Sequence, residues 1–531
     1  MLKGINTMIL VDEDMKKLYN EKIEKLLTDS KRALEINEEN LIKILSDNKK
    51  TIYGKKYRFC EISDGDYYAK RVPLSEYSDY EEGICIENEF VTYPIKYIIG
   101  TSGTTGKQKF FPLTEVALER YSSYIYDMQY HITDVKEKSL HTSVFRSPGG
   151  KTILSSGYFS YLADNGDFDC DDFVGGRELL FSDKITNVKY VKAWLLLSHP
   201  EIVSIQSIFL YDILLIFSYL EENWQTLISD MRNKSVSVSL DENIKEELYR
   251  NSVSEERLLE LEKILGCENG FLVADILPDL RFISGIGGKI YELQGEALKR
   301  YIGDIPIHYF AYASSECMMG VALELDKAQY MLLPNSAYYE FLSLDSDNVH
   351  KMNDIVVGKS YELVITTFSG LYRYKTGDII KILSFEGESP VFQIEGRSNR
   401  ILNIAGEKMP EQIIRDAVKI FGERSNAHIW DFATGIKDDK TPFGYAIFIE
   451  TDSVIEDSDK LFDSILCEFS FDYEDVRSLG MISLPSVYCV KKGEISRVCL
   501  QQKEGMAHNK PSTFLESKQI KELIKSAKEV E

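Results

Sequence analysis

One short segment, Gly100 to Pro112 (GTSGTTGKQKFFP), has the composition of a phosphate-binding loop. Its small and hydroxyl-bearing residues offer hydroxyls and unobstructed backbone N–H groups that can surround a polyphosphate. It is not the common P-loop, because Gln108 stands where that motif has Ser or Thr. A surface linker is the alternative, but the segment directly follows an apolar, strand-like run, IKYIIG (95–100). We therefore predict a nucleotide-binding loop that contains Ser102, Gly103, Thr104, Thr105, Gly106 and Lys107, with Lys107 also among the catalytic residues.

Two later carboxylates stand where chemistry is plausible. Glu316 lies between the apolar runs of YASSECMMG (312–320), where a carboxylate is costly unless it is paired or bound to a metal. Asp378, in GLYRYKTGDII (370–380), follows a glycine and precedes an apolar run, so it can present a carboxylate to ribose hydroxyls at the end of a strand. The alternatives are a surface acid for Glu316 and an ordinary Gly-Asp turn for Asp378.

A glycine-rich stretch, LRFISGIGGKIYE (280–292), follows another strand-like run. Gly285 and Gly287 would let the backbone approach a flat base closely. The stretch fails the dinucleotide fingerprint, because Ile290 occupies the third glycine position. We predict that it forms the adenine-side wall of the site.

These segments need a scaffold of alternating strands and helices, which predicts an α/β fold with helices covering the sheets. Residues 15–49 have helical periodicity, as do 115–129 and 190–227, and the apolar run 204–220 is predicted to be a buried amphipathic helix. IKYIIG and RFISGI (281–286) lack a polar face, as expected when both faces are buried. The Gly/Pro-bearing stretch 387–400 is a plausible boundary between a large N-terminal domain, residues 1–396, and a small C-terminal one, 397–531.

Composition excludes several classes of function. A formal charge of -23 and a pI near 4.9 disfavour docking on nucleic acid or anionic membranes, so we expect neither partner. The eight cysteines form no CxxC pair and are predicted to be reduced, mostly buried thiols. The N-terminus lacks a signal peptide, which favours the cytoplasm. The dispersed histidines, His141 and His308 among them, are expected to be structural.

The phosphate loop resembles the STSGTTGKxK-like loops of the adenylate-forming superfamily. The segments YASSECMMG, PNSAYYEFL (334–342) and YELVITTFSGLYRYKTGDII (361–380) resemble more narrowly the plant acyl-acid amido synthetases, the Gretchen Hagen family, which conjugates auxin or jasmonate to amino acids. Further similar stretches, from NKKTIYGKKYRF to GYAIFIE, occur in the family's order, so the resemblance covers nearly the whole chain.

The resemblance implies an adenylate-forming fold whose small C-terminal domain is a mobile lid. It implies that ATP and Mg²⁺ are cofactors and that Glu316 helps to hold the metal. Arg397 resembles the superfamily's hinge-proximal arginine, and Lys510, in EGMAHNKPSTF, is the candidate catalytic lysine of the C-terminal domain; a salt bridge and a solvated lysine are the respective alternatives. The implied nucleotide-binding set is completed by Tyr312, Ala313 and Ser314 beside adenine, Ser315 at the α-phosphate, and Tyr372.

The implied reaction joins a carboxylic acid to ATP, giving acyl-AMP and pyrophosphate, and then transfers the acyl group to an amine, such as an amino acid. An acyl-CoA ligase shares the first step, because acceptor chemistry is not written in the nucleotide motifs. A non-catalytic nucleotide-binding protein is the alternative outside enzymes. The residues around the acid are expected from the stretch between Lys136 and Trp224. The acid, the amine and the oligomeric state are left open by the sequence.

Overall fold

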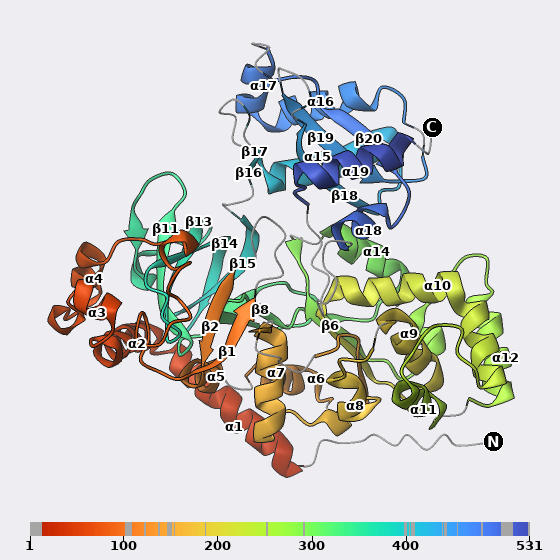
Figure 1. The fold of residues 1–531 in the computed structure, drawn as a ribbon, viewed down its shortest axis with the longest axis horizontal. Helices are drawn as coiled ribbons and strands as arrows, with labels where there is room; N and C mark the ends of the chain where they lie inside the picture. Colours follow the sequence, from red (N-terminus) through yellow and green to blue (C-terminus); the bar gives the residue numbers. More distant parts are fainter. Residues whose placement is uncertain are drawn as a thin grey trace.

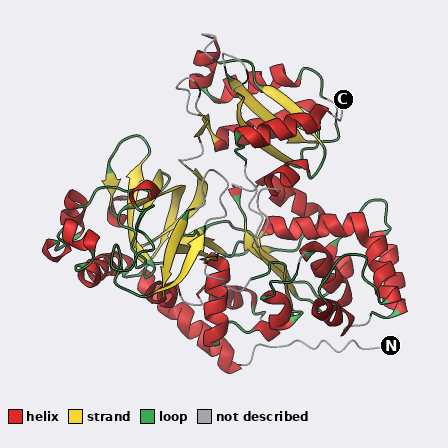
Figure 2. Cartoon of the chain, in the orientation of Figure 1, coloured by secondary structure: helices red, strands yellow, loops and turns green. Residues whose placement is uncertain are grey.

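A computed structural model gives the fold of the chain. It describes residues 13–100, 109–121, 124–135, 138–145, 151–152, 154–185, 187–250, 253–289, 292–397, 401–402, 404, 409–437, 439, 443–453, 455–478, 482–500 and 513–528. Within these ranges strands and helices alternate along much of the chain, and helices lie around the sheets (Figures 1 and 2). No helix among them combines the length and the apolar character needed to cross a membrane.

The largest sheet has eight strands in the order β12-β11-β13-β14-β15-β10-β9-β8, all paired antiparallel. Its strands are β8 (Ala311–Ala313), β9 (Met318–Ala322), β10 (Tyr330–Leu332), β11 (Ala337–Ser343), β12 (Val349–His350), β13 (Ser360–Thr367), β14 (Tyr374–Glu386) and β15 (Ser389–Arg397). The apolar runs at 361–366 and 378–383 form parts of β13 and β14. This sheet carries both carboxylates singled out from the sequence.

A second sheet is parallel, in the order β3-β5-β6-β7, and its strands are β3 (Ser139–His141), β5 (Ser204–Phe209), β6 (Phe282–Ile286) and β7 (Ile307–His308). The helices of this region are α9 (Val188–Ser198), α10 (Leu210–Asn233), α11 (Glu242–Arg250), α12 (Glu255–Leu265), α13 (Val273–Ile276) and α14 (Glu292–Ile302). The prediction of one helix over 204–220 is wrong, because its first six residues form β5 and α10 begins only at Leu210. An interior parallel strand is apolar on both faces, so its pattern cannot be told from that of a buried helix.

A third sheet has the order β2-β1-β4, with β1 (Ile95–Gly100) antiparallel to β2 (Phe110–Thr114) and parallel to β4 (Lys151–Thr152). The strand at 95–100 is confirmed, but the prediction that both of its faces are buried is wrong. Only Ile99 and Gly100 are buried, and Lys96 is exposed. The same prediction is correct for β6, which is buried from Phe282 to Gly285.

The predicted N-terminal helices are confirmed as α1 (Glu13–Ser30) and α2 (Ala33–Asn48). Asn37 of α2 fixes the helix to β11, because its side chain exchanges two hydrogen bonds of 2.8 and 3.1 Å with the backbone of Tyr339. Helical structure between 115 and 129 is also confirmed, as two helices. The remaining helices before β5 are α3 (Ile52–Lys56), α4 (Gly65–Arg71), α5 (Glu115–Tyr121), α6 (Tyr124–Thr133), α7 (Leu154–Asn165) and α8 (Gly176–Leu180).

The residues from 401 onward form a separate set of elements, drawn mostly in blue at the top of Figure 1. Their main sheet has the order β18-β19-β20, and β16 (Ile401–Leu402) pairs with β17 (Met409–Pro410). The elements of the main sheet and the helices are β18 (Asp431–Lys437), β19 (Gly444–Glu450), β20 (Ser486–Val490), α15 (Glu411–Ser425), α16 (Ser458–Phe469), α17 (Phe471–Ser478), α18 (Glu494–Leu500) and α19 (Ser517–Lys528). Two buried apolar clusters hold this part together, and they share no residue with the clusters of the preceding part.

Most of the stretch 387–400, within which the domain boundary is predicted, belongs to the large sheet, because Ser389–Arg397 is strand β15, hydrogen-bonded on both sides. Its Pro390 stands near the start of the strand, where the missing N–H costs least. None of the eight cysteines forms a disulfide, as predicted, but the prediction that most are buried is wrong, because only Cys170 and Cys317 are.

Candidate functional site

The centre of the candidate site is a hydrogen bond between two strands that are not neighbours. Tyr312 of β8 donates its hydroxyl to Oδ2 of Asp378 on β14 at 2.6 Å, although β15, β10 and β9 lie between the two strands. Both side chains are buried, with 4% and 6% exposure. The ring of Tyr312 meets Phe392 of β15 edge-on, with 5.5 Å between ring centroids. The structure thus brings together two residues that the sequence separates by 66 positions.

The backbone around Asp378 is shaped by its neighbours. Gly377 has φ of +76°, a conformation that favours glycine, and its N–H donates to Oε1 of Glu362 at 3.1 Å. The N–H of Asp378 donates to Oγ1 of Thr376 at 3.1 Å. Both residues lie inside β14, so the alternative of an ordinary Gly-Asp turn before the strand does not hold. Arg397, the last residue of β15, stands opposite Asp378 in the β14–β15 ladder.

Glu316 lies in the tight connection between β8 and β9, closed by a 2.9 Å hydrogen bond from Ser314 N–H to the Cys317 carbonyl. The side chain is 9% exposed, and the hydroxyl of Tyr374 approaches Oε1 at 3.5 Å. Among the residues that the structure describes, no Lys or Arg forms an ion pair with this carboxylate, and the buried Oγ of Ser314 has no hydrogen-bond partner. A polar ligand that carries a cation would supply the positive charge that the Glu316 carboxylate lacks and a hydrogen-bond partner for the Ser314 hydroxyl.

Metal binding at this point would need few protein groups. The described ranges contain no cluster of three or more side chains suited to a metal. Mg²⁺ that arrives on a polyphosphate is usually held by one or two carboxylates, with phosphates and water completing its shell. Glu316 fits that requirement. Ser315 and Ala313 are half-buried in the same connection and strand.

Gly285 of β6 and Gly287, just after the strand, have a packing role. A Cβ on Gly285 would lie 3.0 Å from the backbone N of Leu210, and one on Gly287 would lie 2.5 Å from Leu210 Cδ1. The glycines therefore let the end of β6 approach the start of α10. This packing accounts for them without a ligand, and an adenine contact at this place stays a prediction.

Tyr372 lies in the protein interior. Its ring is fully buried and stacks on Tyr53 with centroids 4.8 Å apart, and its hydroxyl donates to the Phe90 carbonyl at 2.7 Å. This environment favours a structural role over a nucleotide contact. The neighbouring Arg373 forms a buried salt bridge, with Nη2 2.9 Å from Oε1 of Glu340.

Several predicted residues lie outside the described part of the chain. They are the loop residues Ser102, Gly103, Thr104, Thr105, Gly106 and Lys107, together with Lys510. The described flanks show where the loop is attached, because Gly100 at the end of β1 stands opposite Phe110 at the start of β2. The loop therefore joins two adjacent antiparallel strands.

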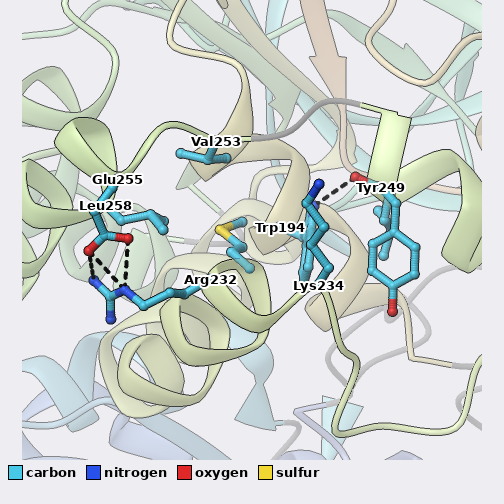
Figure 3. Close-up of a pocket in the computed structure, with 9 residues that line it drawn as sticks. Trp194, Arg232, Lys234, Tyr249, Val253, Glu255 and Leu258 are labelled. Carbon is cyan, nitrogen blue, oxygen red and sulfur yellow. Dashed lines mark hydrogen bonds and ion pairs between the residues drawn. The ribbon is translucent and has the colours of Figure 1, made fainter.

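Sequence reasoning missed Tyr374, whose hydroxyl is the group that contacts Glu316. Its position in the same strand as Asp378 and four residues before it was the available signal. A pocket between α9, α10 and α12, lined by Trp194, Arg232, Tyr249 and Glu255, shares no residue with the site (Figure 3). Its volume of about 80 Å³ is far below the ~300 Å³ of small ligand pockets. Arg232 is engaged by Glu255 at 2.9 Å, so this pocket does not compete as an active site.

The comparisons with known proteins agree with this geometry. The model of the GH3 family N-terminal domain matches residues 22–307, and that of the GH3 family central domain matches residues 330–397. Jasmonoyl–L-amino acid synthetase JAR6 of Nicotiana attenuata is 26% identical, with 92% of each chain covered. Indole-3-acetic acid-amido synthetase GH3.2 of Arabidopsis thaliana is 27% identical, with 78% of this chain and 84% of that protein covered.

Solved structures show the same fold. The acyl acid amido synthetase AtGH3.15, in complex with 2,4-DB, superposes with a TM-score of 0.83 at 23% identity, covering 99% of this chain and 98% of that one. A 2-hydroxyisobutyryl-CoA ligase in its postadenylation state reaches a TM-score of 0.51 at 11% identity, covering 96% and 93%. The predicted adenylate-forming α/β fold is therefore confirmed. Because one family model alone matches more than half of its 531 residues, the chain belongs to the GH3 family.

Proposed function

We propose that this chain is an AMP-forming ligase, which activates a carboxylic acid as an acyl-adenylate and transfers the acyl group to an amino acid. The observation that carries the proposal is the contact between two motifs of one GH3-family chain, in which Tyr312 bonds Asp378 and Tyr374 approaches Glu316. Its relatives are named as synthetases that join acids to amino acids. The substrates are accordingly a small carboxylic acid, ATP and an amino acid.

In the first half-reaction, a carboxylate oxygen of the acid forms a bond to the α-phosphorus of ATP, and the bond to the bridging oxygen breaks to release pyrophosphate. Asp378 accepts hydrogen bonds from the ribose hydroxyls, and Tyr312 orients that carboxylate through the 2.6 Å hydrogen bond. Ser315 contacts the α-phosphate, and residues 102–107 surround the remaining phosphates. Mg²⁺, when bound at Glu316, supplies positive charge to the phosphates.

In the second half-reaction, the neutral amino group attacks the acyl carbon, AMP leaves with the bonding electrons, and the extra proton of the amine is lost to solvent. The acyl-adenylate must be kept from water until then. We assign this to residues 397–531 as a lid on residues 1–396, with Lys510 reaching the α-phosphate and Arg397 at the joint. The separate apolar clusters of the part after residue 401 support the division.

The net charge of -23 supports a protein that acts on small molecules and docks on neither nucleic acid nor membrane surfaces. Eight cysteines that form no disulfide fit a reducing compartment, and we assign the protein to the cytoplasm.

ATP–pyrophosphate exchange tests the first half-reaction, with Mg²⁺, no amine, and a panel of aryl, indolyl and aliphatic acids. We expect exchange that depends on the acid and falls at least ~100-fold in Asp378→Ala, since a charge-assisted contact is lost. The exposed Asp345 provides a matched control, because Asp345→Ala removes a carboxylate from the loop between β11 and β12. Normal exchange in Asp378→Ala would refute the site. Product assays with amino acids and with coenzyme A then separate the ligase proposed here from an acyl-CoA ligase.

A further inference from the structure

A row of polar side chains crosses all four strands of the parallel sheet. In the ladders, His141 stands opposite Gln206, Gln206 opposite Ser284, and Ser284 opposite His308. Residues in register on neighbouring strands project from the same face of a sheet. All four are at most 2% exposed. A continuous polar row on a buried face is unusual, because such a face normally carries apolar side chains.

Two glutamines at this row, Gln129 and Gln206, each have one side-chain amide atom without a hydrogen-bond partner in the described ranges. Nε2 of Gln206 donates to the hydroxyls of Ser139 and Ser204 at 3.2 and 3.1 Å, while its Oε1 has no hydrogen-bond partner. Oε1 of Gln129, on α6, lies 3.4 Å from Nδ1 of His308, and its Nε2 is likewise without a partner. If either side-chain amide is rotated by 180°, its oxygen and nitrogen change places, and one of the two still lacks a hydrogen-bond partner. Each amide therefore has one buried polar atom to offer to a ligand.

The imidazole of His308 is a neutral partner for Gln129. Burial lowers the pKa of His308 to about 4, although a contact with the Ala322 backbone opposes that shift. Ser284 lies 3.4 Å from the same ring nitrogen. The row can thus hydrogen-bond to an uncharged polar group without placing a positive charge in the interior.

The row lies beside the candidate site. His141 and His308 are the last residues of β3 and β7, at the edge where ligands bind in α/β sheets, while Gln206 and Ser284 lie in the middle of β5 and β6. β7 ends at His308, four residues before Tyr312. Helix α6, which carries Gln129, packs against β9, and β9 begins two residues after Glu316. Figure 1 shows α6, β6 and β8 together in the middle of the molecule.

Aromatic rings flank the row. The ring of Phe145 lies 4.7 Å from that of His141, and Phe159 lies 4.3 Å from Phe145. Tyr126 of α6 packs edge-on against Phe159 and Phe310, and its buried hydroxyl finds no partner in the described chain. A flat ring with a polar substituent at one end would match this combination of aromatic faces and unmet amides.

We propose that Gln129 and Gln206, with His308 holding Gln129, form the end wall of the acid-binding site and select an aromatic acid with a hydroxyl remote from its carboxylate. The inference rests on the proposed function. A hydroxyl both donates and accepts, so it can satisfy an unmet oxygen and an unmet N–H together. The wall atoms are enclosed by the neighbouring rings, so the acid reaches them when one of those rings changes rotamer. Gln129 and Gln206 are specificity residues here, and His308 is a positioning residue.

The test compares matched acids in ATP–pyrophosphate exchange: benzoate with 4-hydroxybenzoate, phenylacetate with 4-hydroxyphenylacetate, and cinnamate with 4-hydroxycinnamate. We expect the protein to prefer the hydroxylated member of at least one pair by about tenfold in kcat/KM, through KM. Gln129→Met and Gln206→Met keep the side-chain size and remove the amide. Each should abolish the preference, so that both members of the pair are used with the same kcat/KM.

Gln519→Met, at a buried glutamine of α19 whose oxygen accepts from Glu516 N–H, is the matched control and should keep the preference. Equal use of both members of every pair, or a preference unchanged in both wall variants, would overturn the inference. If no acid supports exchange, the proposed function fails. Calorimetry of acid binding without ATP then still tests whether Gln129 and Gln206 select the hydroxylated acid. Tighter binding of the hydroxylated acid that is lost in Gln129→Met supports it, and equal binding of both acids overturns it.

Discussion

Raising the pH should destabilise the sheet of the C-terminal part, because a buried acid there holds a proton at neutral pH. Asp431 on β18 stands directly opposite Glu450 on β19, and both side chains are at most 4% exposed. Burial and then the charge of Glu450 raise the pKa of Asp431 to about 8, against the effects of the Phe432 N–H and of Arg415. Glu450 is fixed in place, because its carboxylate accepts from the N–H groups of Gly493 and Ile495 at 2.8 Å.

The size and sign of the change in stability follow from the protonation of Asp431 in the folded and the unfolded chain. An unfolded aspartate has a pKa of about 3.9, so between pH ~4 and ~8 the native state holds a proton that the unfolded chain has lost. The stability from this proton is complete below pH ~4 and is lost as the pH rises through the folded pKa. The slope is about 1.4 kcal/mol per pH unit, or roughly 4 kcal/mol between pH 5 and 8. The charges facing the pair from α15 are Glu411 and Arg415, and those from the α18 end are Lys492 and Glu494.

Asp431→Asn provides the comparison, because an amide keeps an acceptor for the Phe432 N–H and cannot ionise. Hydrogen exchange of peptides covering β18 and β19, corrected for intrinsic rates, measures the local free energy of opening at each pH. Relative to the wild type, the variant should gain about 1.4 kcal/mol per pH unit from pH 5 to 8. The exposed Asp452 supplies the control, and Asp452→Asn should show no such gain. A difference between Asp431→Asn and wild type that stays constant over this range would refute the reasoning.

Three other perturbations probe the site and its support. Tyr312→Phe removes the hydrogen bond that orients Asp378, costing about 1 kcal/mol, and should raise the KM for ATP roughly fivefold in the exchange assay; an unchanged KM would contradict that role. Glu316→Gln should raise the Mg²⁺ concentration for half-maximal exchange about tenfold in a metal titration; an unchanged concentration would show that Glu316 does not hold the metal. Arg373→Met leaves Glu340 buried and unpaired, and should cost about 3 to 5 kcal/mol in thermal unfolding; adding Glu340→Met should recover most of the loss, and no recovery would show that the pair is not the cause.

Periodicity in the sequence was a good guide where an element has one solvated face. α1 and α2 alternate charged and apolar residues at helical spacing, and both were predicted. It was a poor guide in the interior, where β5 and the start of α10 read as one apolar run. Strand β15 was missed for a different reason. Its polar and Gly/Pro-bearing sequence is typical of a linker, while its pairing partners, β10 and β14, are fixed by tertiary structure.

The chemistry of the site could be read from motifs only in part. Glu316 and Asp378 were selected because a carboxylate in an apolar context needs a partner, which is a local signal. The hydrogen bond from Tyr312 to Asp378 could not be predicted, since it depends on how a long antiparallel sheet brings distant strands together. Tyr372 was placed in the nucleotide-binding set by its motif alone, and its neighbours Tyr53 and Phe90 lie some 280 or more positions away in sequence.

The attachment of α2 to β11 has a consequence for biosynthesis. Asn37 and Asn40 are among the first described residues to leave the ribosome, yet the carbonyls that they bind belong to Tyr339, Pro334 and Ala337, about 300 residues later. At ~5 to 20 residues per second, translation needs roughly 15 to 60 seconds to supply them. During that interval the part of α2 that packs on β11 lacks its native partner. Helix α2 therefore completes its packing only after β11 has been made, although it precedes β11 by about 300 residues in the sequence.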